Sequence, residues 1–130
     1  MSKGVLDAGV VIGWIRGGHR SAARLDALFR HSRTGQAALT LSTVNLPEVF
    51  IHTAEWSRAT GSDAVALLRA WGVRIQPPDE AIARRVAKLD TSLADGFAAA
   101  TALELGARLH TTDPELVRQL RGKRLPITHY

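Results

Sequence analysis

The chain has no cysteine and no long hydrophobic run, and each absence narrows what it can be. Without cysteine among its 130 residues, it cannot use disulfide bonds, thiol catalysis, iron–sulfur clusters or the usual structural zinc sites. Its apolar stretches fall well short of the roughly 20 residues that a membrane-spanning helix needs. Near the start, Asp7 closes the short apolar run of Val5 and Leu6, which does not resemble a signal peptide. We therefore expect a soluble cytoplasmic protein that makes no membrane contact.

The remaining composition is that of one globular domain. Apolar residues make up 45% of the chain and charged residues 22%, proportions that are typical of folded rather than disordered proteins. A chain of this length buries about two-thirds of its unfolded surface, which suffices for a stable core. Because no internal repeat, low-complexity segment or long linker divides it, the sequence predicts a single domain over residues 1–130.

Lysine is also scarce, since arginine supplies all but three of the 17 positive charges. Against 12 acidic residues, these charges leave a net charge of +5. A small basic domain is attracted to polyanions, of which nucleic acid is the commonest, and guanidinium groups suit the bidentate binding of phosphate. An arginine-rich genome produces the same balance, so charge alone leaves both interpretations open.

Short apolar runs alternate with longer segments of helical period. The runs predict strands at residues 4–6, 37–41, 73–75, 108–111 and 125–128. Helical spacing predicts helices at residues 10–15, 22–29 (capped by Ser21), 43–58, 65–71, 80–89, 92–105 and from Pro114. This alternation is typical of an α/β fold in which a short parallel sheet has helices on both faces. Ligands of such sheets bind beyond the carboxyl ends of the strands.

Acidic residues occupy the positions beyond the carboxyl ends of the predicted strands. Asp7 and Asp113 each follow a predicted strand, and Glu48 and Asp95 lie in the early turns of predicted helices. Each has a simple structural interpretation, because an acid there can cap a helix or interact with the positive end of its dipole. Taken one at a time, helix capping is the better explanation of every one of them.

Taken together, the four acids favour a metal site. Right-handed crossovers bring them to the same end of a parallel sheet. Two carboxylates about 5 Å apart repel by roughly 3 kcal/mol at an effective dielectric constant near 20, so a cluster needs protons or a cation. Mg²⁺ and Mn²⁺ suit an all-oxygen site, where they activate water and stabilise charge on a phosphoryl group. Asn45, Thr111 and Thr112 could orient the carboxylates or the waters of the ion.

The segments around these acids resemble the sequence blocks of the PIN-domain nucleases. Val5-Leu6-Asp7-Ala8 and the segment 42–49 resemble the first two blocks, and the segments 93–95 and 109–113 resemble the last two. No single block is specific, but all four stand in the family's order and spacing over nearly the whole chain. The length is similar to that of the VapC-like toxins of bacterial toxin–antitoxin pairs.

This resemblance implies a PIN-like three-layer domain that acts as a Mg²⁺- or Mn²⁺-dependent endoribonuclease. It implies a homodimer with an RNA substrate, neutralised by a cognate antitoxin that lies in an apolar groove and blocks the acidic pocket. The catalytic and metal-binding carboxylates that it implies are Asp7, Glu48, Asp95 and Asp113. The chain departs from the family at Gly9, where a serine or threonine is often found, so one hydroxyl near the metal is missing.

The histidines and tryptophans carry weaker signals. None of the histidines is paired at the spacing of metal ligands, so we expect them on the surface or beside the site; they are His19, His31, His52, His110 and His129. The three tryptophans lie in helical apolar patterns and are predicted to pack in the core; they are Trp14, Trp56 and Trp71.

Three other functions fit part of this pattern. A response-regulator-like phosphoacceptor needs a lysine soon after a late strand, and none follows residues 108–113 until Lys123. A PIN-like module that binds RNA or a partner without cleavage would lack some of the acids, and all four are present. A PIN nuclease of RNA maturation fits the same residues and remains open. A small antitoxin reading frame beside the gene would distinguish a toxin from it.

Overall fold

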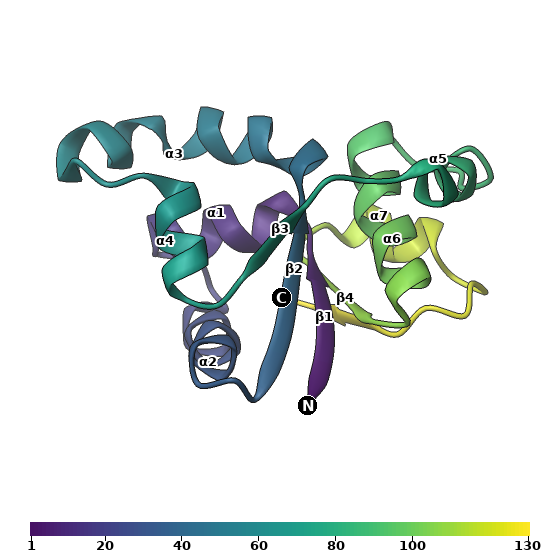
Figure 1. The fold of residues 1–130 in the computed structure, drawn as a ribbon, viewed down its shortest axis with the longest axis horizontal. Helices are drawn as coiled ribbons and strands as arrows, with labels where there is room; N and C mark the ends of the chain where they lie inside the picture. Colours follow the sequence, from purple (N-terminus) through teal and green to yellow (C-terminus); the bar gives the residue numbers. More distant parts are fainter.

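A computed structural model describes residues 1–130 as a five-stranded sheet between two layers of helices (Figure 1). In chain order the elements are β1 (Ser2–Leu6), α1 (Ala8–Arg16), α2 (Ala22–Arg33), β2 (Ala37–Ser42), the 3₁₀ turn η1 (Thr43–Asn45), α3 (Leu46–Thr60), α4 (Ala64–Ala70), β3 (Arg74–Gln76), α5 (Glu80–Val86), α6 (Leu93–Leu105), β4 (Arg108–Thr111), α7 (Pro114–Gln119) and β5 (Ile127–His129). No helix is both long enough and apolar enough to cross a membrane.

All strands of the sheet run parallel, in the order β3-β2-β1-β4-β5. β1 lies at the centre, where Leu6 is in register with Leu41 of β2 on one side and with His110 of β4 on the other. The predicted α/β class with a parallel sheet is therefore confirmed. Because the strands share one direction, all their carboxyl ends lie along one edge.

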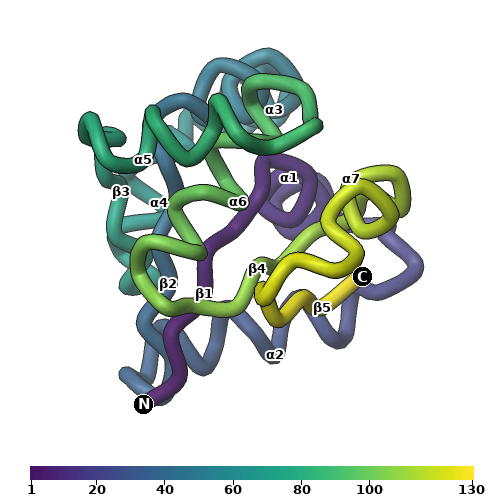
Figure 2. Tube along the Cα trace, turned by 90° about the vertical axis from the view of Figure 1, so that its right-hand side faces the viewer, coloured from purple at the N-terminus to yellow at the C-terminus, as the bar shows by residue number.

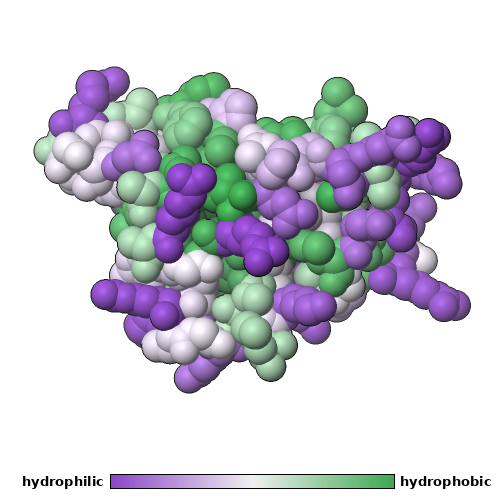
Figure 3. Space-filling view, viewed as in Figure 1, coloured by the Kyte–Doolittle hydropathy of each residue, from purple (hydrophilic) through white to green (hydrophobic).

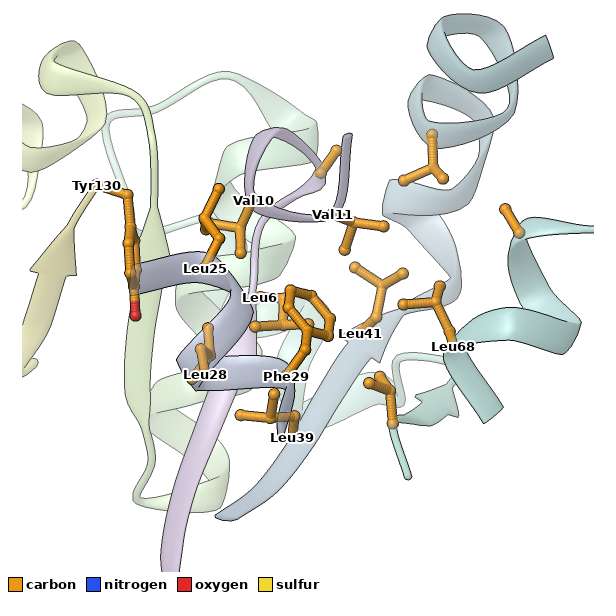
Figure 4. Packing of buried hydrophobic residues seen from close by; sticks show 14 of the residues in the cluster. Leu6, Val10, Val11, Leu25, Leu28, Phe29, Leu39, Leu41, Leu68 and Tyr130 are labelled. Atoms are coloured by element: carbon orange, nitrogen blue, oxygen red, sulfur yellow. The ribbon is translucent and has the colours of Figure 1, made fainter. Parts of the chain in front are cut away.

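Helices α1 to α4 cover one face of the sheet and helices α5 to α7 cover the other (Figure 1). The larger core lies under the first group, where Phe29 of α2 packs among Leu6, Leu39 and Leu41 of the strands (Figure 4). On the opposite face, Val5 packs against the buried alanines of α6. Small side chains let this helix lie close to the sheet, which brings its first turn near the end of β1.

Several helix starts are capped by aspartate. Asp7 and Asp113 make the capping bonds that the sequence allows, to the backbone N–H groups of Val10 and Glu115. Asp79 and Asp63 are further caps, which accept hydrogen bonds from Ile82 at 2.9 Å and Ala66 at 2.8 Å. The predicted cap at Ser21 is wrong, because its hydroxyl makes no capping bond and its own N–H is instead bound by His19 Nδ1 at 2.9 Å.

The element boundaries differ from prediction where proline alters the backbone. The segment 43–58 divides into η1 and α3, with Pro47 in the first turn of α3, where a missing N–H leaves no helical bond unmade. The last strand begins at Ile127 rather than Leu125, because Pro126 has no N–H to donate and offers only its carbonyl, to the N–H of Leu109 at 2.9 Å.

The tryptophans pack against the larger core while staying partly accessible, which agrees with the prediction. Trp14 stacks on Phe29 with ring centroids 3.9 Å apart and meets the edge of Trp71 at 5.2 Å. Trp56 is the third aromatic side chain packed against this cluster.

One histidine contradicts the expectation of a surface position. His110 on β4 is buried, and its Nδ1 lies 2.8 Å from the hydroxyl of Tyr130. Burial lowers the pKa of His110 to about 4, with a smaller effect from Arg108, so its ring is neutral at physiological pH. His110 is therefore a core residue of the fold.

Candidate functional site

An acidic pocket lies at the carboxyl edge of the sheet, where the helices that follow β1, β2 and β4 begin. Figure 2 shows the starts of α1 and α7 at the same end of the molecule as the carboxyl ends of β1 and β4. The pocket has a volume of about 320 Å³, and its lining residues are Asp7, Ala8, Gly9, Glu48, Asp95, Thr112, Asp113 and Pro114. The fold thus brings together the four acids that were singled out in the sequence.

Asp7 is the most deeply buried of these acids, with only 4% of its surface exposed. One carboxylate oxygen accepts a hydrogen bond from the N–H of Val10 at 3.0 Å and the other accepts one from the hydroxyl of Thr111. Burial raises the pKa of Asp7 to about 6 in spite of these two bonds, and the charges of Asp95 and Asp113 raise it further. An ionised Asp7 is therefore costly unless a cation lies beside it.

Asp95 projects from the first turn of α6 and is half-buried. Its Oδ2 accepts a hydrogen bond from the hydroxyl of Ser92 at 3.0 Å. Burial raises the pKa of Asp95, Ser92 offsets part of this rise, and the charge of Asp113 adds to it. The sequence pattern suggests a capping box here, but Ser92 makes no capping bond and holds the carboxylate instead.

Asn45 is buried and binds the backbone of the first turn of α6, the turn that carries Asp95. Its side-chain amide donates a hydrogen bond to the carbonyl of Ala94 at 3.1 Å, which ties the start of α3 to the start of α6. Its own Oδ1 is buried without a partner. Asn45 does not line the pocket, so it acts on the site through the backbone next to Asp95.

Asp113 caps α7 and lines the pocket at the same time. Its Oδ1 accepts a hydrogen bond from the N–H of Glu115 at 2.9 Å, and its own N–H donates to Thr111 Oγ1 at 3.0 Å. The buried Thr111 hydroxyl therefore links Asp113 to Asp7. Glu48, in the first turn of α3, is exposed at the rim of the pocket. The capping and site interpretations of Asp7 and Asp113 are compatible.

No basic side chain neutralises this pocket. The ion pairs of the protein join Glu80 to Arg84, Glu104 to Arg85 and Glu115 to Arg118, and none includes an acid of the pocket. As the side chains stand, no three histidine, cysteine, aspartate or glutamate residues are arranged to hold a metal ion. The donors available are nevertheless carboxylate oxygens that no cationic side chain neutralises, a set whose chemistry fits Mg²⁺ or Mn²⁺.

Two further hollows continue from the acidic pocket along the surface. A groove of about 360 Å³ shares Gly9 and Thr112 with the pocket and is also lined by Arg16 and His19. Arg16 in turn borders a third hollow of about 430 Å³ beside α3. A path therefore runs from the acidic pocket, past two basic side chains, to the surface of α3.

The apolar surface of α3 borders this path. Ile51 and Trp56 line the third hollow, and Ile51 is 72% exposed. Phe50, 45% exposed, lies by a separate hollow of about 290 Å³ on another side of the helix. Figure 3 shows apolar residues at the top of the view over part of the region where α3 lies in Figure 1, and hydrophilic residues over α5 at the right.

Fold and pocket together define the class of the protein: a doubly wound α/β domain with an acidic pocket at the carboxyl ends of its central strands. Within this class, the family described as PIN domain matches residues 4–121, nearly the whole chain. The chain belongs to the PIN domain family. No curated protein matches the chain closely enough to refine this assignment.

Solved structures of toxins share the fold at low sequence identity. VapBC2 from Rickettsia felis, bound to a DNA fragment from its promoter, is 15% identical, with a TM-score of 0.72 and 98% of each chain covered. A toxin–antitoxin complex from Klebsiella pneumoniae is 20% identical, with a TM-score of 0.68 and 98% of each chain covered. VapC20 from Mycobacterium tuberculosis, a toxin that cleaves the sarcin–ricin loop, is 13% identical, with a TM-score of 0.63 and coverage of 88% of this chain and 93% of that one.

Proposed function

We propose that this protein is a metal-dependent endoribonuclease that acts as the toxin of a toxin–antitoxin pair. The observation that carries the proposal is the pocket lined by four carboxylates with no ion pair among them. PIN domains are typically metal-dependent nucleases, and the structural neighbours include a toxin that cleaves RNA.

The three aspartates would hold Mg²⁺ or Mn²⁺, and Glu48 would complete the site from the rim. Such an ion activates a water molecule and offsets the charge that develops on a phosphoryl group. The protein's part is to fix the carboxylates in advance: Val10 and Thr111 hold Asp7, and Ser92 holds Asp95. In this proposal Thr111 would orient Asp7, and Asn45 would fix the backbone beside Asp95 through the carbonyl of Ala94.

A basic surface beside the pocket supports RNA as the substrate. Arg16 and His19 line the groove that adjoins the acidic pocket, so a phosphodiester chain leaving the pocket meets the guanidinium of Arg16 and the imidazole of His19. The net charge of +5 attracts polyanions from a longer distance. The acids would then hold the metal beside the scissile phosphate. The basic groove would bind the phosphates next to the scissile one.

We expect the purified protein to cleave RNA with Mg²⁺ or Mn²⁺ and to stop when EDTA is added. The reason is that four carboxylates repel a phosphodiester unless a cation lies between them. The measurement is incubation with total RNA, with and without the metal, followed by mapping of the new ends. Cleavage that survives exhaustive chelation would exclude the metal mechanism, and intact RNA in all conditions would exclude the nuclease.

The continuous path of hollows supports an antitoxin as the partner. An extended peptide could place apolar side chains on Ile51 and Trp56 and reach along the groove to the acidic pocket. A cationic side chain of that peptide would then neutralise the carboxylates and exclude the substrate. The other apolar side of α3, around Phe50, is available for a second copy of the chain in a homodimer.

Co-expression with the product of the adjacent reading frame should yield a complex that does not cleave RNA. Ile51→Glu should weaken this complex by about tenfold or more, because burial of an isoleucine side chain contributes roughly 1.5–3 kcal/mol. Ala66→Glu, which adds the same charge to the exposed surface of α4, serves as the control. Affinity and residual cleavage would both be measured. A chain that stays monomeric and ignores this neighbour would contradict the toxin assignment but not the nuclease.

A further inference from the structure

Gly9 is an unusual residue for its place in the structure. It is the second residue of α1, and its φ angle is not among the positive values that only glycine adopts readily. Glycine costs helix stability relative to alanine, so the backbone conformation gives no reason for it here. The reason must lie in the space that a side chain would occupy.

That space is already filled by Thr112. A Cβ atom built on Gly9 would lie well under 3.0 Å from Thr112 Oγ1, closer than real Cβ atoms approach any neighbour. The same atom would lie 3.4 Å from a carboxylate oxygen of Asp7. One turn further along α1, a Cβ on Gly13 would meet Leu25 at an ordinary contact distance of 3.4 Å. Within α1 the conflict is therefore found at Gly9 and not at Gly13, and the atom that it involves is the threonine hydroxyl.

The Thr112 hydroxyl is also uncommitted. It makes no hydrogen bond within the protein, whereas the neighbouring Thr111 hydroxyl donates to Asp7 and accepts from the N–H of Asp113. Thr112 lines the acidic pocket, and it lines the groove that contains Arg16 and His19 as well. The unbonded Thr112 hydroxyl therefore lies at the boundary between the acidic pocket and the groove that Arg16 and His19 line.

We propose that Thr112 donates a hydrogen bond to a phosphate oxygen of the RNA bound across this junction, and that Gly9 is required to make room for it. The inference rests on the proposed nuclease function and adds a substrate contact to it. A phosphate oxygen is the acceptor that fits, because a phosphodiester bound across this junction would pass from the carboxylates, which would hold the metal, to the side of Arg16. Gly9, which lacks a hydroxyl of its own, serves the site by admitting that of Thr112.

The test uses an RNA oligonucleotide that the wild-type protein cleaves with Mg²⁺. Thr112→Val keeps the shape and removes the hydroxyl, so kcat/KM should fall by about 10- to 100-fold, the loss of one hydrogen bond to a charged oxygen. Thr112→Ser keeps the hydroxyl and should remain close to wild type. Gly9→Ala should lower kcat/KM by a similar factor, because its methyl group displaces the hydroxyl. The double variant Gly9→Ala/Thr112→Ala should be no worse than Thr112→Ala alone, since the shortened side chain no longer meets the new methyl group and both changes remove one contact.

A second readout separates substrate contact from metal binding and from folding. The rise in melting temperature on addition of Mn²⁺ should be the same in Thr112→Val as in the wild type. A smaller rise would assign Thr112 to the metal and overturn the proposal, as would full activity of Thr112→Val. Additive losses in the double variant would overturn the role of Gly9. A wild-type protein that cleaves no RNA would overturn the proposed function itself, which is a different result from an active wild type with an active Thr112→Val.

Discussion

Replacement of Asp113 by asparagine is expected to abolish RNA cleavage without unfolding the protein. Asparagine caps a helix about as well as aspartate, so α7 keeps its start. The pocket, however, loses one charged oxygen ligand of the ion. A bound metal stabilises the transition state by several kcal/mol. The loss corresponds to about 1000-fold in kcat/KM. The same replacement at Asp95 should have an effect of similar size.

Asp79 provides a matched control for this experiment. It caps α5 by accepting a hydrogen bond from the N–H of Ile82, three residues on, whereas Asp113 accepts from Glu115, two residues on; both bonds are 2.9 Å long, but Asp79 lies outside the acidic pocket. Asp79→Asn should therefore leave both cleavage and melting temperature nearly unchanged. Full activity of Asp113→Asn would mean that Asp113 is a cap and nothing more. Lost activity with an equally large loss of metal-free stability would mean that it holds the fold.

The Asp7→Asn variant should be more stable than the wild type when no metal is present. The pKa of Asp7 is about 6 in the folded protein against 3.8 in the unfolded chain, so the folded state binds the proton more tightly. Between pH 3.8 and 6 the contribution of Asp7 to the free energy of unfolding falls as the pH rises. Above pH 6 the folded protein bears the full free-energy cost of the buried, ionised carboxylate. That cost is about 2–3 kcal/mol, which the amide avoids, so the melting temperature at pH 7.5 should rise by about 5–10 °C.

The pH dependence and the response to metal test this explanation. The difference between variant and wild type should shrink below pH 6 and vanish below pH 3.8, where Asp7 becomes protonated in both states. Mg²⁺ should stabilise the wild type and not the variant. Asp63→Asn is the control, since Asp63 makes the same capping bond on an exposed surface. A variant less stable than the wild type at pH 7.5 without metal would show that the Asp7 carboxylate supports the fold.

Most of the fold follows from patterns that are local in the sequence. The strands and helices arise from apolar periodicity and from glycines that end helices, such as Gly106, whose φ is +61°. The acids could be located because an α/β fold places its site after the strands, a rule that needs no contact information. Asp7 and Asp113 satisfy that rule and the capping pattern together, so the sequence alone left both explanations standing.

The features that could not be predicted depend on contacts between distant residues. His110 is buried, and its ring is bound by the hydroxyl of Tyr130, 20 residues later. No local sequence pattern predicts this contact. Ser92 has the position of a cap, and only the structure shows that its hydroxyl holds Asp95. The Gly9–Thr112 pair likewise joins a helix near the start of the chain to a loop near its end.

The central position of β1 has a consequence for how the protein is made. Asp7 meets Asp113 only after β4 has been synthesised and has paired with β1. At typical elongation rates of about 5–20 residues per second, the intervening hundred or so residues take roughly 5–20 s to appear. During that interval the nascent chain carries Asp7 without Asp113, so it has no complete acidic pocket.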